Sequence, residues 1–447
     1  MLKSRYAVYL PALSDAYLRY VPGSSFPRSA PISPDDLNFL DPNNRLFHYP
    51  YALTSAGQTN GVKSQHVSML DLRDKTKTTV VADSGGFQIQ SGQIPFRGTA
   101  TAQKMLAWME DVGDYSMILD FPTGGISAGN MTVHFNRLVQ EGHGPTLATM
   151  NAQNQLGDEF NACLLQTIIN NNDFVQHRNP TKTRLLNVLQ GRNEAESKTW
   201  YEAVKHLPFE DWSFAGQHQS SFTMLLNRIF DMIHDGKLEK VEWIHVLGTS
   251  KPFAGAILTT LQRRLRQYVN PNIQISFDSA SPFRNAAFNG IYLGAMLDKE
   301  GWSFATKELA QIDPSLRNLP LKDFIDIALP VKERMNSWGW FDETYNIVRA
   351  HTGISKVITA ADILQNAKGG ADSVGTALLM NHNTQAMIDT FEHINEIVFS
   401  DEATPQNMPT DVWRVMYSVE LLFDKHFDRA HQFIKDFSGS LDLFAHL

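Results

Sequence analysis

The sequence has almost no cysteine, since Cys163 carries the only thiol among 447 residues. One thiol cannot form an internal disulfide, and it cannot supply a metal site built from several thiolates. It is most simply a small buried side chain. The chain also lacks an apolar run long enough to span a bilayer, and its first residues lack the hydrophobic segment of a signal peptide. We therefore expect a cytoplasmic protein with no membrane association.

Positive charge is scarce as well. The chain has 39 Lys and Arg against 47 Asp and Glu, a net charge of -8. This balance argues against a protein that coats nucleic acid through a global positive field, but it is compatible with a local basic groove. The candidates for such a groove are two clusters, Arg178, Lys182 and Arg184, and Arg263, Arg264 and Arg266. For the second cluster, a solvated helix face is as good an interpretation as a phosphate contact.

Short apolar segments recur along the chain, and the stretches between them are long enough for helices. The segments lie at residues 7–10, 46–49, 79–82, 115–119, 185–189, 213–215, 243–247 and 273–277. Strands that alternate with helices indicate parallel strands with crossover connections, so the fold class is α/β. No Gly-rich dinucleotide fingerprint follows the first strand, and the polar motifs follow several different strands. Both observations favour a TIM (β/α)8 barrel over an open doubly wound sheet.

Two regions depart from this alternation. Residues 21–45 are rich in Pro, Ser, Asn and Asp, and we expect them to form an N-terminal insertion that runs over the surface. Beyond residue 300 we expect amphipathic helices with few strands, as at residues 386–398 and 412–437. The sequence thus predicts a barrel with insertions over residues 1–400 and a C-terminal helical segment over residues 401–447, with residues 404–409 as the linker.

Two aspartates stand where an apolar strand gives way to a loop. Asp83 follows residues 80–82, and Asp278 follows residues 273–277. A strand that delivers a carboxylate at its C-terminal end is how barrel enzymes present catalytic groups at one face. Two such carboxylates suggest a general acid/base and a nucleophile.

The residues around these aspartates carry a more specific signal. Six segments occur in order: Asp83-Ser84-Gly85-Gly86-Phe87-Gln88, Leu119-Asp120 with Pro122, Leu189-Gln190-Gly191, Ala215-Gly216, Val246-Leu247-Gly248-Thr249, and Phe277-Asp278 with Pro282 and Arg284. Together they resemble the signature segments of the tRNA-guanine transglycosylase family. A weaker match to the family follows at residues 379–383. A single Asp-Ser-Gly-Gly match would be weak, whereas six ordered segments are specific.

The resemblance implies a different catalytic role for each of the two aspartates. Exchange of a base breaks a C1′–N bond through a transition state with oxocarbenium character, which requires a carboxylate beneath the sugar and a proton donor above the base. By resemblance, Asp278 is the nucleophile that bonds to C1′. Asp83 is the acid that protonates departing guanine and the base that deprotonates the incoming purine analogue.

The remaining segments are implied to bind the substrate. Asp120, Gln190 and the backbone at Gly216 would read the edge of the purine. Taken alone, Asp120 is better explained as a residue that caps a turn. Its role in binding the purine depends on the ordered set of six segments. Four other residues have an implied binding role. Ser84 would hydrogen-bond to Asp83 or to the base, and Gly86 would let the backbone pass close to the base. Phe87 would stack on the base, and Arg284 would also contact the substrate.

The sequence departs from the family at two places. Gln217, His218 and Gln219 follow Gly216 where the family has small apolar residues and an acid, and their role stays open. Members of the queuine type also carry three cysteines and a histidine that bind zinc. His382 falls at the place of that histidine, but the cysteines are missing, so we expect no zinc module and no cofactor, and a packing or capping role for His382.

A missing zinc module, a long insertion and an acidic chain resemble the DNA-acting branch, the DpdA-type DNA guanine transglycosylases of phages and bacterial DNA-modification clusters. The implied partners are DNA and a free 7-deazaguanine base, such as 7-cyano-7-deazaguanine, in the host cell cytoplasm if the protein is phage-encoded. The alternative is a tRNA-guanine transglycosylase of the queuosine or archaeosine type. A sugar glycosidase and a non-catalytic nucleic-acid-binding subunit are the rival classes, and a homodimer is left open.

Overall fold

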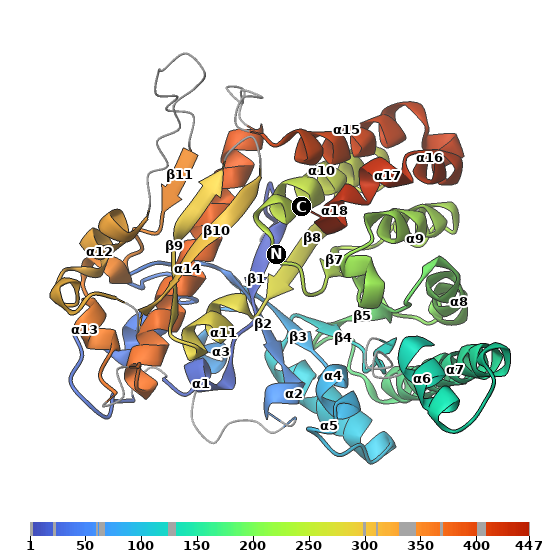
Figure 1. Ribbon diagram of the computed structural model, residues 1–447, viewed down its shortest axis with the longest axis horizontal. Coiled ribbons are helices and arrows are strands. Elements are labelled where there is room, and N and C mark those ends of the chain that lie inside the picture. The colour runs from blue at the N-terminus through green and yellow to red at the C-terminus, as the bar shows by residue number, and fades with distance from the viewer. Residues whose placement is uncertain are drawn as a thin grey trace.

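An eight-stranded parallel sheet forms the centre of the molecule (Figure 1). The computed structural model describes residues 3–20, 24–59, 61, 68–123, 131–297, 301–309, 312–329, 346–366, 370–399 and 408–446. The strands are β1 (Val8–Pro11), β2 (Tyr51–Ser55), β3 (Thr79–Asp83), β4 (Tyr115–Met117), β5 (Arg184–Leu189), β6 (Asp211–Phe214), β7 (Trp243–Val246) and β8 (Gln274–Ser279). Their order is β1-β8-β7-β6-β5-β4-β3-β2, and a bridge between Ala12 and Leu53 joins β1 to β2. The sheet is nearly closed, which confirms the expected (β/α)8 barrel.

The strands are buried because side chains cover both faces of the sheet, as parallel sheets require. Val80, Val81 and Ala82 of β3, for example, have no exposed surface. The rings of Tyr115 on β4 and Trp243 on β7 stack with their centroids 4.6 Å apart. Since β5 and β6 separate these two strands in the sheet, the contact crosses the inside of the barrel, and the barrel interior is packed with side chains.

Helices connect most of the strands and pack around them (Figure 1). The helices between consecutive strands are α1 (Asp15–Leu18), α2 (Ala56–Thr59), α3 (Met69–Leu72), α4 (Gly86–Gln90), α5 (Thr99–Val112), α6 (Met131–Gln140), α7 (Pro145–His177), α8 (Glu194–Val204), α9 (Phe222–His234) and α10 (Pro252–Tyr268). In their described residues, the two connections from β1 to β3 contain only one-turn helices. The long helix α14 (Ser373–Phe399) packs against β1 and α1 on this side of the barrel.

A second sheet, which the sequence did not predict, lies beside the barrel. It is antiparallel, with the order β10-β9-β11, and consists of β9 (Gly290–Leu297), β10 (Trp302–Glu308) and β11 (Asn346–Arg349). It follows α11 (Ser281–Ala287) and packs against α14 (Figure 1). Two further short helices of this region are α12 (Leu321–Ala328) and α13 (Ala360–Ile363).

The N-terminal insertion is more deeply packed than the sequence suggests. Leu37, Phe39 and Leu40 are buried, and the hydroxyl of Tyr17 donates to the carbonyl oxygen of Leu37 at 2.6 Å. A one-turn 3₁₀ helix, η1 (Pro34–Leu37), contacts α14. The expectation of a surface excursion is therefore wrong for this part of residues 24–45, because a Pro- and Asp-rich segment can still bury the few apolar residues that it carries.

The C-terminal helices dock on the outside of the barrel (Figure 1). They are α15 (Thr410–Lys425), α16 (Ala430–Asp436), α17 (Ser438–Leu441) and α18 (Leu443–His446), so the helical pattern expected over residues 412–437 is interrupted once. α15 packs against α10, and α16 packs against α9. The ring of Phe444 stacks on that of Phe222 with the centroids 5.0 Å apart. The expected boundary at residues 400 and 401, and most of the expected linker, lie outside the described residues.

Candidate functional site

All the sequence-predicted site residues lie at one end of the barrel. They follow the C-terminal ends of β3, β4, β5, β6 and β8, which is the end where barrel enzymes carry their active sites. A cleft of about 710 Å³ opens there between the loops. The predicted residues that line the cleft are Phe87, Gln190, Gly216, Asp278 and Arg284. Asp83, Ser84, Gly86 and Asp120 do not line it, and the contacts below show how they support it.

Asp278 reaches the cleft from the end of β8, and its side chain is 14% exposed. The backbone N–H of Gly248 donates to its Oδ1 atom at 2.8 Å. The Nε2 atom of His245 lies 3.3 Å from the same oxygen. The other oxygen, Oδ2, has no hydrogen-bond partner among the described residues. A carboxylate that is fixed through one oxygen and open at the other is suited to nucleophilic attack.

Asp83 lies at the end of β3 in a different electrostatic setting. The hydroxyl of Ser55, at the end of the neighbouring strand β2, donates to its Oδ2 atom at 2.6 Å. Burial raises the pKa of Asp83 above its usual value, the negative charge of Asp278 raises it further, and the hydrogen bonds from Ser55 and the backbone of Gly85 oppose the rise. A raised pKa favours the protonated form, which is the form that a general acid needs.

The sequence did not identify Ser55, which takes the place expected for Ser84. The side chain of Ser84 is buried, and its hydroxyl has no hydrogen-bond partner within the described residues. The expected contact between Ser84 and Asp83 is therefore absent from this structure, and Ser55 makes it instead. An unpartnered buried hydroxyl is costly, and a ligand group that reached Ser84 would satisfy it.

Asp120 and Gln190 form a buried pair beside the cleft. The side-chain Nε2 of Gln190 donates to Oδ2 of Asp120 at 2.7 Å. Burial raises the pKa of Asp120 to about 7, the charge of Asp83 adds to the rise, and the hydrogen bond from Gln190 opposes it. This pair presents acceptors and an amide donor side by side, which is the arrangement that reads the N1–H, 2-amino and O6 groups of a purine.

Two glycines let the loops approach this pair. A Cβ atom at Gly86 would lie 2.3 Å from the carbonyl oxygen of Asp120. Gly216 has φ +61°, and a Cβ atom there would lie 2.7 Å from Oε1 of Gln190. Any larger residue at either position would push apart the ends of strands that carry the site.

Phe87 and Arg284 both border the cleft. Phe87, in α4, is 61% exposed, although an isolated aromatic ring would ordinarily be buried. Arg284, in α11, is exposed, and within the described part of the chain its guanidinium has no carboxylate partner. An open aromatic face and an unpaired cation at one mouth suit a base and a phosphate respectively.

The segment after Gly216 divides between packing and the cleft. His218 is fully buried, and its ring nitrogens lie 2.7 Å from Ser197 Oγ and 2.7 Å from the carbonyl oxygen of Ala215. Burial lowers the pKa of His218 to about 4, so it is a neutral packing residue. Gln219 lines the cleft, whereas Gln217 donates to Ser220 Oγ at 2.6 Å.

The two basic clusters, which were candidates for a basic groove, do not border the cleft. Arg178, Lys182 and Arg184 precede or begin β5, so they lie at the opposite end of the barrel. Arg264 and Arg266 occupy the last turns of α10, which runs back to that end. Carboxylates already neutralise most of these cations, in the pairs Arg178–Glu210 (2.9 Å), Lys182–Asp111 (3.3 Å), Arg184–Asp211 (2.7 Å) and Arg264–Asp424 (2.9 Å). Arg266 donates to backbone oxygens, and Arg263 lies over the ring of Phe399.

His382 is a packing residue, as expected. It lies in α14 with Nδ1 2.7 Å from Thr352 Oγ1 and Nε2 2.8 Å from the carbonyl oxygen of Tyr292. Its neighbour Asn383 binds the backbone of β9 through two hydrogen bonds, so this segment fastens α14 to the second sheet. In the described ranges, no group of three or more His, Cys, Asp or Glu side chains is placed to hold a metal ion. Cys163 is half-buried in α7, and burial raises the pKa of its thiol to about 11.

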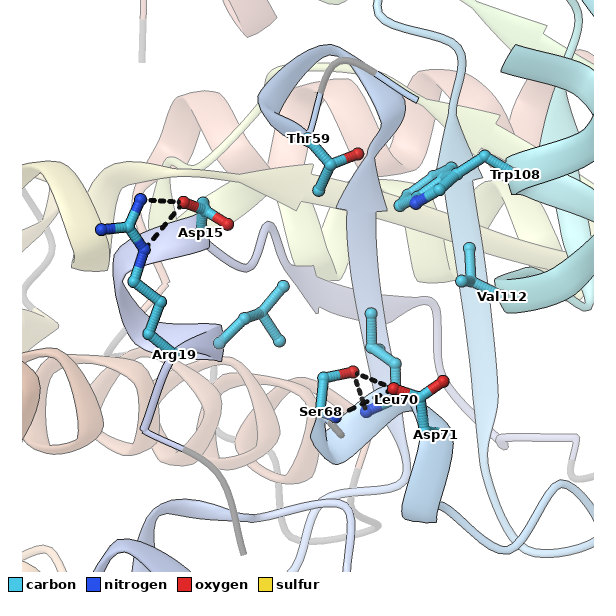
Figure 2. Close-up of a pocket in the computed structure, with 9 residues that line it drawn as sticks. Asp15, Arg19, Thr59, Ser68, Leu70, Asp71, Trp108 and Val112 are labelled. Carbon is cyan, nitrogen blue, oxygen red and sulfur yellow. Dashed lines mark hydrogen bonds and ion pairs between the residues drawn. The ribbon is translucent and has the colours of Figure 1, made fainter. Parts of the chain in front are cut away.

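A second pocket, outside the barrel, is not part of this site (Figure 2). It has a volume of about 40 Å³, far below that of the cleft. Its polar groups face one another: Arg19 pairs with Asp15 at 2.6 Å, and the side chain of Asp71 accepts from Ser68 at 2.9 Å (Figure 2). Trp108 covers the other side of the pocket, which we interpret as a packing defect between α1, α3 and α5.

Two comparisons with known proteins identify no relative of this chain. No protein-family model matches the chain, and a search of curated proteins gives no match. Among the helices that the structure describes, none is long and apolar enough to cross a membrane. A functional argument for this protein therefore depends on the geometry of the cleft.

Proposed function

We propose that this protein exchanges guanine in DNA for a 7-deazaguanine base through a covalent aspartyl-nucleotide intermediate. The observation that supports it best is the contrast between Asp83 and Asp278. The carboxyl of Asp83 is half-buried and has a raised pKa, whereas that of Asp278 is held by an N–H donor and opens into the cleft. A carboxyl group that tends to keep its proton, beside a carboxylate with one free oxygen, can supply the acid and the nucleophile of one reaction.

In the first half of the reaction, Oδ2 of Asp278 attacks C1′ of the target nucleotide. The bond between C1′ and N9 breaks, its electron pair goes to the base, and the proton of Asp83 neutralises the departing guanine. In the second half, the carboxylate of Asp83 removes a proton from N9 of the incoming 7-deazaguanine. That nitrogen attacks C1′, and the bond from C1′ to Asp278 breaks, which restores both carboxyl groups.

Base recognition falls to the residues beside the cleft. Asp120 would accept hydrogen bonds from the N1–H and 2-amino groups, and the amide of Gln190 would donate to O6. Phe87 offers an exposed ring on which the base can stack, a contact worth about 1–3 kcal/mol per base in nucleic-acid complexes. A sugar glycosidase would have no use for this purine-reading pair, which supports the transglycosylase over that rival.

The nucleic acid must bring one nucleotide into the cleft. The target carbon is covered inside a stacked duplex, so the base must be flipped out or already unpaired, at a cost of a few kcal/mol. Arg284, at the mouth of the cleft, is suited to bind a flanking phosphate. The net charge of -8 repels DNA at long range, and salt weakens this repulsion. The preference for DNA over tRNA is supported by the resemblance to the DNA-acting branch.

A direct exchange assay tests the proposal. Purified protein is incubated with labelled guanine and either duplex DNA, single-stranded DNA or unmodified tRNA, and label in the polymer is counted. We expect label in DNA from the wild type and none from Asp278→Ala. Asp323→Asn, on α12, removes one carboxylate that does not line the cleft and should keep full activity.

The outcomes separate the parts of the proposal. Faster labelling of tRNA than of either form of DNA would contradict the DNA assignment and leave the two-aspartate chemistry intact. Absence of label from all three polymers, or undiminished labelling by Asp278→Ala, would contradict the transglycosylase proposal itself.

A further inference from the structure

A chain of hydrogen bonds runs along the inside of the barrel and ends beneath Asp278. The indole N–H of Trp243 donates to Oγ of Ser276 at 2.7 Å. The same oxygen lies 2.8 Å from Nδ1 of His245. Nε2 of His245 then lies 3.3 Å from Oδ1 of Asp278. Trp243, His245 and Ser276 have essentially no exposed surface, so their hydrogen bonds have no competition from bulk water.

The positions of these residues follow from strand geometry. Trp243 and His245 are two residues apart on β7, and Ser276 and Asp278 are two residues apart on β8, so each pair points to the same side of the sheet. β7 and β8 are neighbours in register, with His245 opposite Ser276. Trp243 contacts Tyr115 across the barrel, so the common side is the interior.

This chain assigns the tautomer of His245. Ser276 Oγ accepts a hydrogen bond from Trp243, and the only other group that its hydroxyl reaches among the described residues is Nδ1 of His245, so the hydroxyl donates to Nδ1. Nδ1 is then an acceptor, and in the neutral ring the remaining hydrogen is on Nε2. Nε2–H faces Asp278, although the 3.3 Å contact in this structure does not complete a hydrogen bond. Such contacts often tighten when substrate binds.

We propose that His245 is a positioning residue that holds Oδ1 of Asp278 and so directs Oδ2 at the sugar. The inference rests on the function proposed above for Asp278. Oδ1 would have two N–H donors, from His245 and from the backbone of Gly248, and Oδ2 would have none. When Oδ2 bonds to C1′, Oδ1 becomes the carbonyl oxygen of the ester and still accepts from both donors. When the incoming base displaces the ester, both donors stabilise the carboxylate that leaves.

Two variants of His245 separate positioning from packing. His245→Phe keeps a planar ring without an N–H group. His245→Gln places an amide N–H close to the position of Nε2. If His245 positions Asp278, kcat should fall about 10- to 100-fold in the Phe variant with little change in KM for DNA, and the Gln variant should recover most of it. If His245 only packs, the Gln variant should be no more active than the Phe variant, because it buries a less suitable polar group.

Nitrogen-15 NMR of the wild-type protein, labelled at histidine, tests the same chain without any assay of activity. We expect the His245 signal, identified by its loss in His245→Phe, to show a protonated Nε2 and an unprotonated Nδ1, and to shift in Asp278→Asn. A protonated Nδ1 with an unprotonated Nε2 would overturn the proposal, as would equal kcat values for the Phe and Gln variants. If no polymer is labelled but the Nε2–H tautomer is found, the proposed function fails and the contact between His245 and Asp278 stands.

Discussion

The buried carboxyl of Asp120 should make the stability of this protein depend on pH in a predictable direction. In the unfolded chain its pKa would be about 3.9, whereas burial raises it to about 7 in the folded protein. Below about pH 4 the group is protonated in both states. Between about pH 4 and pH 7 the unfolded chain loses this proton while the folded protein retains it, so folding stability falls as the pH rises.

The magnitude follows from the two pKa values. A difference of about 3 between them corresponds to about 4 kcal/mol in the free energy of unfolding, at 1.36 kcal/mol for each pKa unit. Asp120→Asn removes the titration and keeps an oxygen that can accept from Gln190, so the local hydrogen bond survives. The free energy of unfolding of Asp120→Asn, minus that of the wild type, should therefore increase by about 4 kcal/mol between about pH 4 and pH 7.

Urea denaturation followed by tryptophan fluorescence across this pH range measures the difference. Ser213→Ala is a matched control, because Ser213 is fully buried in another strand of the barrel, β6, and carries no titratable group. Its difference from the wild type should be the same at every pH. A constant difference for Asp120→Asn, or one that decreases as the pH rises, would refute a buried carboxyl with a raised pKa.

Three further predictions concern the cleft. Ser55→Ala removes a hydrogen bond that lowers the pKa of Asp83, so the alkaline limb of the pH–rate profile should move to higher pH, and an unchanged or lowered limb would contradict the assigned acid. Gly216→Ala should destabilise the protein by about 1–3 kcal/mol in thermal unfolding because φ is positive there, whereas Gly439→Ala, in open space, should have almost no effect. Arg284→Ala should reduce the dependence of log Kd for DNA on log salt concentration by about 1, as measured by fluorescence anisotropy, and an unchanged slope would exclude a phosphate contact.

The barrel was largely predictable because its strands are short, apolar and separated by helices. Seven of the eight predicted strand segments overlap β1 and β3–β8. The segment at residues 46–49 is wrong, because β2 begins only after Pro50, at Tyr51. The second sheet was missed although β9 is an apolar run that the sequence shows, because its partner β10 has alternating exposed and half-buried residues and carries no strand signal.

The candidate site was predictable as a set of strand ends but not as a set of contacts. The ordered segments indicated Asp83, Asp120 and Asp278, and parallel strands necessarily bring their C-terminal ends to one side. Ser55 was missed because no motif surrounds it. His245 had one available signal, which is an imidazole inside an otherwise apolar strand, two residues from an inward-facing Trp243.

The central claim is that Asp278 forms a covalent bond to C1′, and mass spectrometry of the intact protein tests it most directly. The wild type is mixed with a guanine-containing DNA strand, without any incoming base, and rapidly denatured. We expect a protein–DNA adduct that maps to the peptide containing Asp278, and no adduct in Asp278→Asn. Turnover of labelled guanine with no adduct, or an adduct on another residue, would contradict the covalent mechanism assigned to this aspartate.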